Sequence, residues 1–425
     1  MIVTDYSIAA TNSRLSLEAG TSADIWAERP LTAADFLAVR RQTALKGYKW
    51  DAQVGDVTTL AAFPLVMKRR VWRQLAIWAE QMTAELAVAE TELAQRPDLL
   101  GQLGLPSALR QVLAMQVPVT PTAGRVIRFD FHLTSAGWRI SEANSDVPGG
   151  FSEASHYTSL MARYYPQLQI AGNPGETWGD FLASAAGSKG ALALVSAAGY
   201  LEDHQVVSYL AERLRSRGCS AFLAKPEQIK WRDGHAYLET AWHSGPLAVV
   251  VRFYQAEWMA KLSSRTGWAH FFRGGKTSVA NPPLAVLSES KRFPLVWDSL
   301  ETKLPTWRAL LPETRDPRDV AWVGDDHWLL KTAMCNTGDT VSSRPWMPQS
   351  LWRQIRFKVM LHPGNWIAQR RFESLPVATP NGLRHVCVGV YTVNGRAAGA
   401  YTRLSPEPLI NFAAIDVPLL LEAND

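Results

Sequence analysis

The first third of the chain has the periodicity of amphipathic helices. Over Phe63–Gln95, apolar side chains recur at intervals of three and four residues, which places them on one face of a helix. Arg96-Pro97 ends this pattern, and a second short helix is predicted over Pro106–Met115. We therefore predict an N-terminal helical region over residues 1–120 that serves as scaffold. The apolar positions of the long helix are Val66, Val71, Leu75, Trp78, Met82, Leu86, Ala89 and Leu93.

The pattern changes from helical to alternating after residue 125. Val126–Leu133 and Trp138–Asn144 alternate polar and apolar side chains and are rich in β-formers, so each is predicted to be a strand. Ser135-Ala136-Gly137 is a turn between them, and the two strands form a predicted β-hairpin. After a loop at Asp146–Gly150, a helix is predicted over Ser152–Tyr165, with Ser152 as its N-cap.

The middle of the chain has the pattern of a βαβ unit. Ala191–Val195 is an apolar run bounded by glycines, Asp203–Arg217 has helical periodicity, and Ala221–Ala224 returns as a strand. A hairpin at Ile229–Tyr237 and a buried strand at Leu247–Phe253 follow. This order predicts a Rossmann-like layer. No GxGxxG sequence follows the first strand, so a nicotinamide enzyme is the weakest of the functional alternatives.

The last part mixes strands and short helices with many tryptophans. Asn394-Gly395 is a two-residue hairpin turn, because both residue types tolerate a positive φ. The strands predicted in this part are Trp328–Lys331, Asn365–Phe372, His385–Val393 and Ala397–Leu404.

Composition and charge limit the possible partners. The chain has 425 residues, 47% of them hydrophobic, which is enough for a large core and two or three domains. A net charge of +5 is spread out, and Lys68-Arg69-Arg70 and Arg370-Arg371 are too short for a nucleic-acid tract. The three cysteines are widely spaced, the N-terminus has no signal-peptide pattern, and no apolar stretch could span a membrane. We therefore predict a cytoplasmic protein with neither a membrane nor a nucleic-acid partner.

The hairpin carries a candidate metal site. Asp130 lies on its first strand, and Glu142 and Asn144 lie two apart on the second, facing the same side. Carboxylate and amide oxygens suit Mg²⁺, which shares its shell with phosphates. Arg128 faces the same side as Asp130 and could hold a carboxylate or a phosphoryl group. From the pattern alone, an ordinary pair of surface acids is the competing interpretation.

Two later segments could contact a nucleotide. Lys331 ends an apolar strand and precedes a loop of small residues that contains Gly338, an arrangement suited to a lysine that reaches phosphate. The strand that contains Ile367 and Gln369 could offer backbone edges and an amide to a purine. Taken singly, an exposed lysine and a simple core strand are the competing interpretations.

In combination these motifs resemble the glutathionylspermidine synthase-like branch of the ATP-grasp superfamily. That family carries R-x-D, then E-x-N-x-D-x-P, then a strand-end lysine with a glycine loop, a hinge strand with glutamine, and a late arginine after an A-G pair. The resemblance is ordered and covers roughly Arg128 to Pro418. The matching segments are Arg128-Phe129-Asp130, Glu142 to Pro148, Phe253 to Met259, Ser290 to Trp297, Lys331 with Gly338, Ile367-Ala368-Gln369 and Ala398 to Arg403.

The resemblance implies a fold and its domains. It implies a mixed α+β and α/β ATP-grasp fold that is circularly permuted, because the metal hairpin precedes the lysines here. The implied domains are the N-terminal helical region (1–120), the metal-binding part of the ATP-grasp domain (121–184), a Rossmann-like pre-ATP-grasp domain (185–280), and the nucleotide-binding part (281–425).

The resemblance also implies roles for single residues. Asp130, Glu142 and Asn144 would bind two Mg²⁺ ions that bridge the ATP phosphates. Lys291, Lys331 and Gly338 would bind the phosphates, and Ile367 and Gln369 the adenine. Arg128 and Arg403 would be catalytic and would stabilise an acyl phosphate and its tetrahedral adduct.

Two departures from the family pattern bear on function. The glycine loop of the family carries G-R-x-G, whereas this chain has Cys335-Asn336-Thr337-Gly338 and so lacks an arginine. The family segment that holds glutathione, T-P-[TS]-S, is replaced by Val147-Pro148-Gly149-Gly150-Phe151. We predict an ATP-dependent carboxylate–amine ligase whose acid is an amino acid or small peptide other than glutathione. The alternative is a catalytically weakened homologue that acts as a nucleotide-binding or scaffold subunit; the sequence leaves the oligomeric state unknown.

Overall fold

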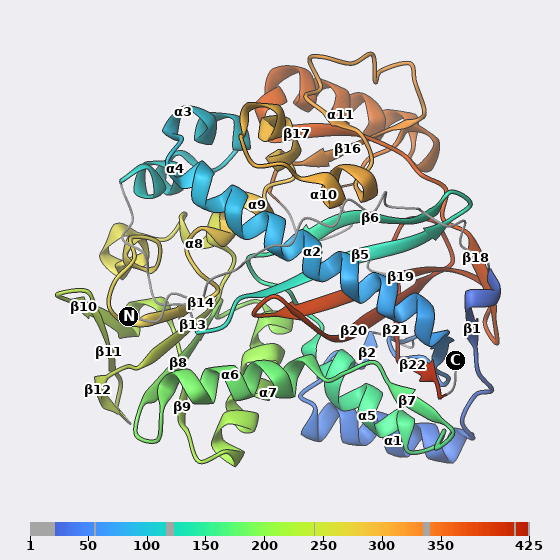
Figure 1. The fold of residues 1–425 in the computed structure, drawn as a ribbon, viewed down its shortest axis with the longest axis horizontal. Coiled ribbons are helices and arrows are strands. Elements are labelled where there is room, and N and C mark those ends of the chain that lie inside the picture. The colour runs from blue at the N-terminus through green and yellow to red at the C-terminus, as the bar shows by residue number, and fades with distance from the viewer. Residues whose placement is uncertain are drawn as a thin grey trace.

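A long antiparallel sheet forms the centre of the computed structural model, which describes residues 22–54, 57–115, 123–241, 243–334, 341–411 and 414–423. Its strands run in the order β21-β20-β19-β5-β6, and β18 pairs with the start of β19 (Figure 1). Both hairpins predicted among these strands are confirmed, and Asn394 and Gly395 turn with φ of 51° and 84°. The strands are β5 (Val126–Thr134), β6 (Gly137–Asn144), β18 (Pro376–Thr379), β19 (Gly382–Val393), β20 (Arg396–Ser405) and β21 (Ile415–Val417).

Helix α2 (Arg69–Ala94) crosses one face of this sheet and packs on β19 and β20 (Figure 1). Its buried side chains recur at three and four positions, as the sequence predicts. The helix begins later than the predicted Phe63, because Leu65–Met67 forms strand β4 instead and pairs with β1 and β22. Short helices follow at α3 (Pro97–Leu100), η2 (Gly101–Leu103) and α4 (Ser107–Ala114).

The predicted βαβ unit is confirmed in a second, parallel sheet. Its order is β14-β13-β8-β9, and α7 connects β8 to β9. A small antiparallel sheet, β10-β11-β12, is inserted between β9 and β13. The elements are α6 (Pro174–Ala186), β8 (Ala191–Ser196), α7 (Leu201–Ser216), β9 (Ser220–Ala224), η4 (Pro226–Gln228), β10 (Ile229–Arg232), β11 (His235–Glu239), β12 (Ser244–Pro246), β13 (Val249–Phe253), α8 (Ala256–Met259), η5 (Ser264–Thr266), η6 (Trp268–Phe271) and β14 (Ser278–Ala280).

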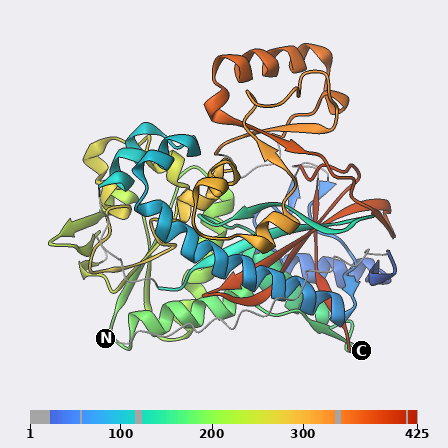
Figure 2. The ribbon, with the colours of Figure 1, turned by 45° about the horizontal axis from the view of Figure 1, so that its top comes forward.

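A small lobe projects from the rest of the molecule (Figure 2). It contains the antiparallel sheet β15-β17-β16 and helix α11, joined by a cluster of buried tryptophans. Segments between β14 and β15 lead into it. The elements are α9 (Ala285–Glu289), η7 (Phe293–Ser299), α10 (Pro305–Leu310), β15 (Thr314–Arg315), β16 (Trp328–Thr332), η9 (Arg344–Trp346), α11 (Gln349–Leu361), η10 (Pro363–Asn365) and β17 (Trp366–Arg370).

A further sheet joins distant parts of the chain in the order β1-β4-β22-β7. Helices α1 and α5 lie on the same side of the molecule as this sheet (Figure 1). The elements are η1 (Ser22–Asp24), β1 (Ile25–Ala27), α1 (Ala33–Lys46), β2 (Gln53–Val54), β3 (Val57–Thr58), β4 (Leu65–Met67), η3 (Glu153–Tyr157), α5 (Thr158–Ala162), β7 (Leu168–Ile170) and β22 (Leu419–Glu422).

The prediction that Ser152 caps a helix is wrong. Ser152 already has helical backbone angles, and its hydroxyl donates to the carbonyl of Gly47 rather than accepting from the first turn. The segment opens with a π-helical turn over Glu153–Tyr157 before α5. A long-range contact to the N-terminal part of the chain therefore takes the place of the local cap.

Candidate active site

The polar side chains of β5 form a buried charge cluster around Asp130. Its Oδ1 accepts from Arg128 Nε at 2.7 Å, and its Oδ2 accepts from Arg128 Nη2 at 3.0 Å and Asn144 Nδ2 at 3.3 Å. Arg128 Nη1 donates to the carbonyl of Gly149 at 2.8 Å. Arg128, Asp130 and Asn144 are all buried. The R-x-D and E-x-N motifs therefore meet in one place.

Arg403 reaches the same carboxylate from β20, across the intervening strand β19. Its Nη2 donates to Asp130 Oδ2 at 2.9 Å. The strand between them carries Gly389 opposite Asp130, where a Cβ would lie 2.7 Å from Arg128 Cδ and 2.9 Å from Asp130 Oδ1. The guanidinium groups of Arg128 and Arg403 both lie over the ring of Tyr401, at 5.2 and 5.4 Å from its centroid. Glycine at 389 is what allows two arginines to meet one aspartate.

Glu142 faces a different pair of cations and lies next to a β-bulge that interrupts the hairpin. The register shifts between Asp130 and Phe131, so that Ser141 is the extra residue on β6. Glu142 Oε2 lies 3.3 Å from Lys291 Nζ, and Lys331 Nζ donates to the carbonyl of Ser141 at 3.0 Å. The two predicted phosphate-binding lysines therefore come together at the predicted metal ligand.

These contacts shift the pKa of each group. Burial alone would raise the pKa of Asp130, but Arg128 and Arg403 outweigh it and hold that pKa at about 2. Burial would also raise the pKa of Glu142, but Lys291 and Lys331 outweigh it and lower that pKa. Burial lowers the pKa of Lys331 to about 8, although Glu142 counteracts it. Both carboxylates are thus ionised at neutral pH.

Two adjoining pockets open beside these groups, between the large sheet and the small lobe. Ser141, Glu142, Lys331 and Gln369 line both of them. The larger, of about 680 Å³, also includes Asp130 and Arg403, and the smaller includes Lys291 and Ile367. Further walls are formed by His132, Leu329, Val341, Trp346, Arg371, Phe372, Cys387, Pro408, Leu409 and Ile410 in the larger pocket.

The structure thus gathers most of the predicted site residues, with three exceptions. Among the described residues, neither pocket wall includes Arg128 or Asn144, which lie behind Asp130. Gly338, together with Asn336, lies outside the described residues. Gln369 lines the pockets while its Nε2 donates to Thr314 Oγ1 at 3.0 Å.

The donor set fits a hard divalent cation that is shared with phosphates. No three His, Cys, Asp or Glu side chains gather as a metal site within the described ranges, and the predicted set instead combines two carboxylates with one amide. Asp130 Oδ1 accepts one hydrogen bond and Glu142 opens to both pockets, so oxygen donors remain for a cation. Four cationic side chains surround these two carboxylates, an excess that suits phosphate oxygens.

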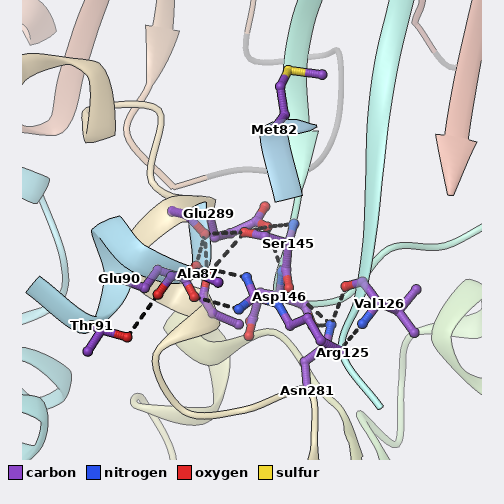
Figure 3. A network of polar contacts seen from close by, with 12 residues as sticks. Met82, Ala87, Glu90, Thr91, Arg125, Val126, Ser145, Asp146, Asn281 and Glu289 are labelled. Carbon is purple, nitrogen blue, oxygen red and sulfur yellow. Dashed lines mark hydrogen bonds and ion pairs between the residues drawn. The ribbon is translucent and has the colours of Figure 1, made fainter. Parts of the chain in front are cut away.

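The loop after Asn144 is held by a buried polar network (Figure 3). Glu289 Oε2 accepts from the backbone N–H groups of Ser145 at 2.6 Å and Asp146 at 2.8 Å. Asn281 Nδ2 donates to the carbonyls of the same two residues at 3.0 and 3.1 Å. The Asp146 carboxylate pairs with the buried Arg252 of β13, which joins the loop to the parallel sheet. The last acid of the E-x-N-x-D motif is therefore structural support here and not part of a pocket wall.

Residues 45–422 match the model of the glutathionylspermidine synthase pre-ATP-grasp family. The chain belongs to this family. The resemblance read from the motifs is thereby confirmed, and the match extends through most of the N-terminal region as well. No curated protein sequence matches the chain significantly.

Three solved structures are similar to this chain to different degrees. A glutathione synthetase-like effector (GSS30) from Globodera pallida, in its apo form, is 12% identical with a TM-score of 0.62, covering 91% of this chain and 96% of that one. A putative γ-glutamylcysteine synthetase from Methylobacillus flagellatus is 10% identical, covers 79% and 88%, and has a TM-score of 0.40. D-alanyl-alanine synthetase A from Vibrio cholerae is 14% identical, covers 52% and 69%, and has a TM-score of 0.34. The first similarity supports a mixed α/β, ATP-grasp-like fold.

As a member of the glutathionylspermidine synthase pre-ATP-grasp family, the chain is a distant homologue of ATP-grasp C–N ligases, which usually use ATP and Mg²⁺. Motif reasoning missed two buried residues of this site. His132 lines the larger pocket two residues after Asp130, with Nε2 3.1 Å from Ser141 Oγ. Glu289 lies two residues before Lys291 and lines the smaller pocket. Their spacing from known motif residues was the only signal for either in the sequence.

No described helix is both long enough and apolar enough to cross a lipid bilayer. This finding covers the described part of the chain only.

Proposed function

We propose that this protein is an ATP-dependent carboxylate–amine ligase. The observation that carries the proposal is the meeting of Glu142, Lys291, Lys331, Asp130 and Arg403 along two adjoining pockets between two sheets. Family membership gives the reaction class by distant homology only. The arrangement of charges adds a reason, because it concentrates cations where a triphosphate and a carboxylate would both need them.

The proposed reaction has two steps. The substrate carboxylate attacks the γ-phosphorus of ATP, which gives an acyl phosphate and ADP. The amine then attacks the acyl carbon, loses a proton, and expels phosphate to leave an amide. Asp130 and Glu142 would hold Mg²⁺, with Asn144 behind Asp130 as the third oxygen donor of the predicted set, and the ion would neutralise phosphate charge.

The protein's own residues divide the remaining work. Lys291 and Lys331 bind phosphate oxygens, and Gln369 with the backbone of Ile367 binds the adenine. Arg403 lines the larger pocket, where it can stabilise the negative charge of the acyl phosphate and its adduct. Arg128 holds Asp130 in place through two hydrogen bonds and reaches toward the acid substrate only if its contact with Gly149 is exchanged.

The acid is proposed to be an amino acid or small peptide other than glutathione, and the partner an amine. Val147 and Phe151 are buried, and Phe151 stacks on Trp178, so these positions offer no hydroxyl to a peptide. The carbonyl of Gly149 is already held by Arg128 and by Tyr391. The family's hydroxyl-rich glutathione contact is therefore replaced by a packed apolar loop.

The absence of the loop arginine supports a second candidate function. Asn336 stands where the family pattern has arginine, which favours a weakened homologue that binds nucleotide as a scaffold subunit. The two functions differ in turnover, because only the ligase releases ADP in an amine-dependent manner.

The test combines the protein with ATP, Mg²⁺ and pooled acids and amines, and measures ADP release and product masses. We expect amine-dependent ADP release, lowered on the order of a hundredfold or more in Glu142→Gln, since a charge that serves the transition state is lost. Glu373→Gln, at a side chain 85% exposed, is the control and keeps wild-type turnover. ATP binding without turnover for any pair would favour the scaffold function, and the absence of Mg-ATP binding would refute both.

A further inference from the structure

The short segment Glu289-Ser290-Lys291 touches the metal-ligand strand from two sides. Glu289 ends α9 and is almost completely buried, 3% exposed. Its Oε2 accepts the backbone N–H groups of Ser145 and Asp146, and the Ser145 hydroxyl at 3.4 Å. Two residues later, Lys291 Nζ lies 3.3 Å from Glu142 Oε2. Glu289 thus holds the backbone that follows Asn144, and Lys291 contacts Glu142.

The same segment is also tied to the small lobe. The backbone N–H of Lys291 donates to the carbonyl of Ala333 at 2.8 Å, just beyond strand β16 that carries Lys331. The hydroxyl of Ser290 donates to the carbonyl of Leu103. Segment 289–291 therefore fixes the spacing between the two lysines and the strand of Glu142.

Glu289 accepts hydrogen bonds from the backbone N–H groups of Ser145 and Asp146, whereas Asn281 donates to the backbone carbonyls of the same two residues (Figure 3). The remaining contacts of Ser145, through Ser288 and onward to Glu90, go through its side chain. Among the described contacts, Glu289 alone accepts from these two amides. Its loss would free the peptide groups that directly follow Asn144 to move.

We propose that Glu289 is a positioning residue for the divalent cations that this site binds, acting through the backbone that sets Glu142 and Asn144. The proposal rests on the proposed function of the site. Metal and catalytic constellations must be held within about 0.5 Å, and loss of a group that orients a ligand lowers metal affinity by roughly 10–100-fold. The Glu289 carboxylate contacts the backbone that directly follows the oxygen donors, and a group that orients metal ligands acts from such a position.

The experiment measures ATP affinity by calorimetry, with Mg²⁺ and with EDTA, for wild type, Glu289→Ala and Glu289→Gln. We expect Mg²⁺ to tighten ATP binding in wild type and this tightening to shrink by about tenfold or more in Glu289→Ala. Affinity in EDTA stays within about threefold, because Lys331 and Gln369 are untouched. Glu289→Gln retains most of the Mg²⁺ effect, since its amide oxygen can accept both N–H groups.

A matched control separates positioning from stability. Glu92 accepts from the N–H groups of Glu301 and Thr302 and from the Thr302 hydroxyl, the same pattern of acceptors among residues that line neither pocket. Glu92→Ala is expected to lower the melting temperature and leave the Mg²⁺ effect unchanged. A wild-type Mg²⁺ effect in Glu289→Ala, or an equal loss in Glu92→Ala, would overturn the proposal. If wild type shows no Mg-ATP binding, the proposed function itself fails.

Discussion

At the scale of single residues, Asp130 and Lys331 differ in how their charges are supported. Asp130 is held by Arg128 and Arg403, so burial does not neutralise it. Lys331 has no hydrogen bond to a carboxylate among its described contacts; its ammonium donates to the carbonyl of Ser141. Burial therefore lowers its pKa to about 8. An arriving phosphate would supply the missing partner.

This arrangement predicts a pH dependence for nucleotide binding. Below pH 8 Lys331 is an ammonium, and above it the free protein increasingly carries a neutral amine that attracts phosphate less. Wild-type ATP affinity, measured by calorimetry, is expected to fall as pH rises past 8, by at most about tenfold per unit. Binding at pH 8 should also take up protons, visible as a dependence of the heat on the buffer. A Lys331→Met variant that shows the same pH profile as wild type would contradict this assignment.

The motif residues of the hairpin could be predicted to meet because each lies on a strand with a regular alternation. Asp130 and Glu142 oppose each other in the hairpin, and the period of two fixes their faces. The extent to which each of these residues is buried could not be predicted. Glu142 opens to the pockets, whereas Asn144 and Arg128 on the same two strands are buried and line neither pocket. Glu289 escaped notice because its partners are backbone N–H groups, which carry no sequence signal.

At the scale of elements, strand β19 acts as a spacer between the two arginine-bearing strands. It pairs with β5 on one side and β20 on the other, and Gly389 lies where Arg128, Asp130 and the Tyr401 carbonyl converge. The chain has an ordinary strand conformation at this glycine. Space, and not backbone freedom, is therefore what requires glycine here.

Gly389→Ala is expected to disturb the charge cluster around Asp130. A Cβ at 2.7 Å from Arg128 Cδ and 2.9 Å from Asp130 Oδ1 forces both side chains to move, with an overpacking cost of about 1–3 kcal/mol. We expect Mg-ATP affinity to fall together with the melting temperature. Gly199→Ala, where a Cβ meets no atom within 4 Å, serves as the control and changes neither. Unchanged Mg-ATP affinity in Gly389→Ala would mean that the cluster is not needed intact.

The elements with strong local patterns were predictable, and those defined by distant partners were not. Helix α2 and strands β5, β6, β19 and β20 follow from periodicity and turn residues over eight residues or more. Strands β1, β4 and β22 have three or four residues each and exist only because they pair across the chain. Such pairing overrode the helical pattern that began at Phe63.

At the scale of the whole molecule, the N-terminal part is joined to the site by a buried ion cluster. Lys49 Nζ lies 2.6 Å from Glu153 Oε1, 3.0 Å from Asp51 Oδ1 and 3.1 Å from Asp416 Oδ2. Asp416 also accepts from the hydroxyl of Tyr401 at 2.7 Å, and the Tyr401 ring lies under both arginines of the Asp130 cluster. Three distant parts of the chain therefore depend on one ammonium group.

Lys49→Met should destabilise the fold by about 3–5 kcal/mol, because it leaves the buried carboxylates of Glu153 and Asp416, and the half-buried one of Asp51, without their cation. Burial alone would lower the pKa of Lys49, but the carboxylates outweigh it and raise that pKa well above its ordinary value, so the cation is present throughout the neutral range. The difference from wild type, measured by chemical denaturation, is expected to shrink as pH falls, because burial raises the pKa of Glu153, which then takes up a proton and no longer needs the ammonium. Lys46→Met, at an exposed position at the end of α1, is the control and should have little effect. A loss that is the same at pH 4 and pH 8 would show that packing of the lysine stem, and not its charge, joins the N-terminal part to the site.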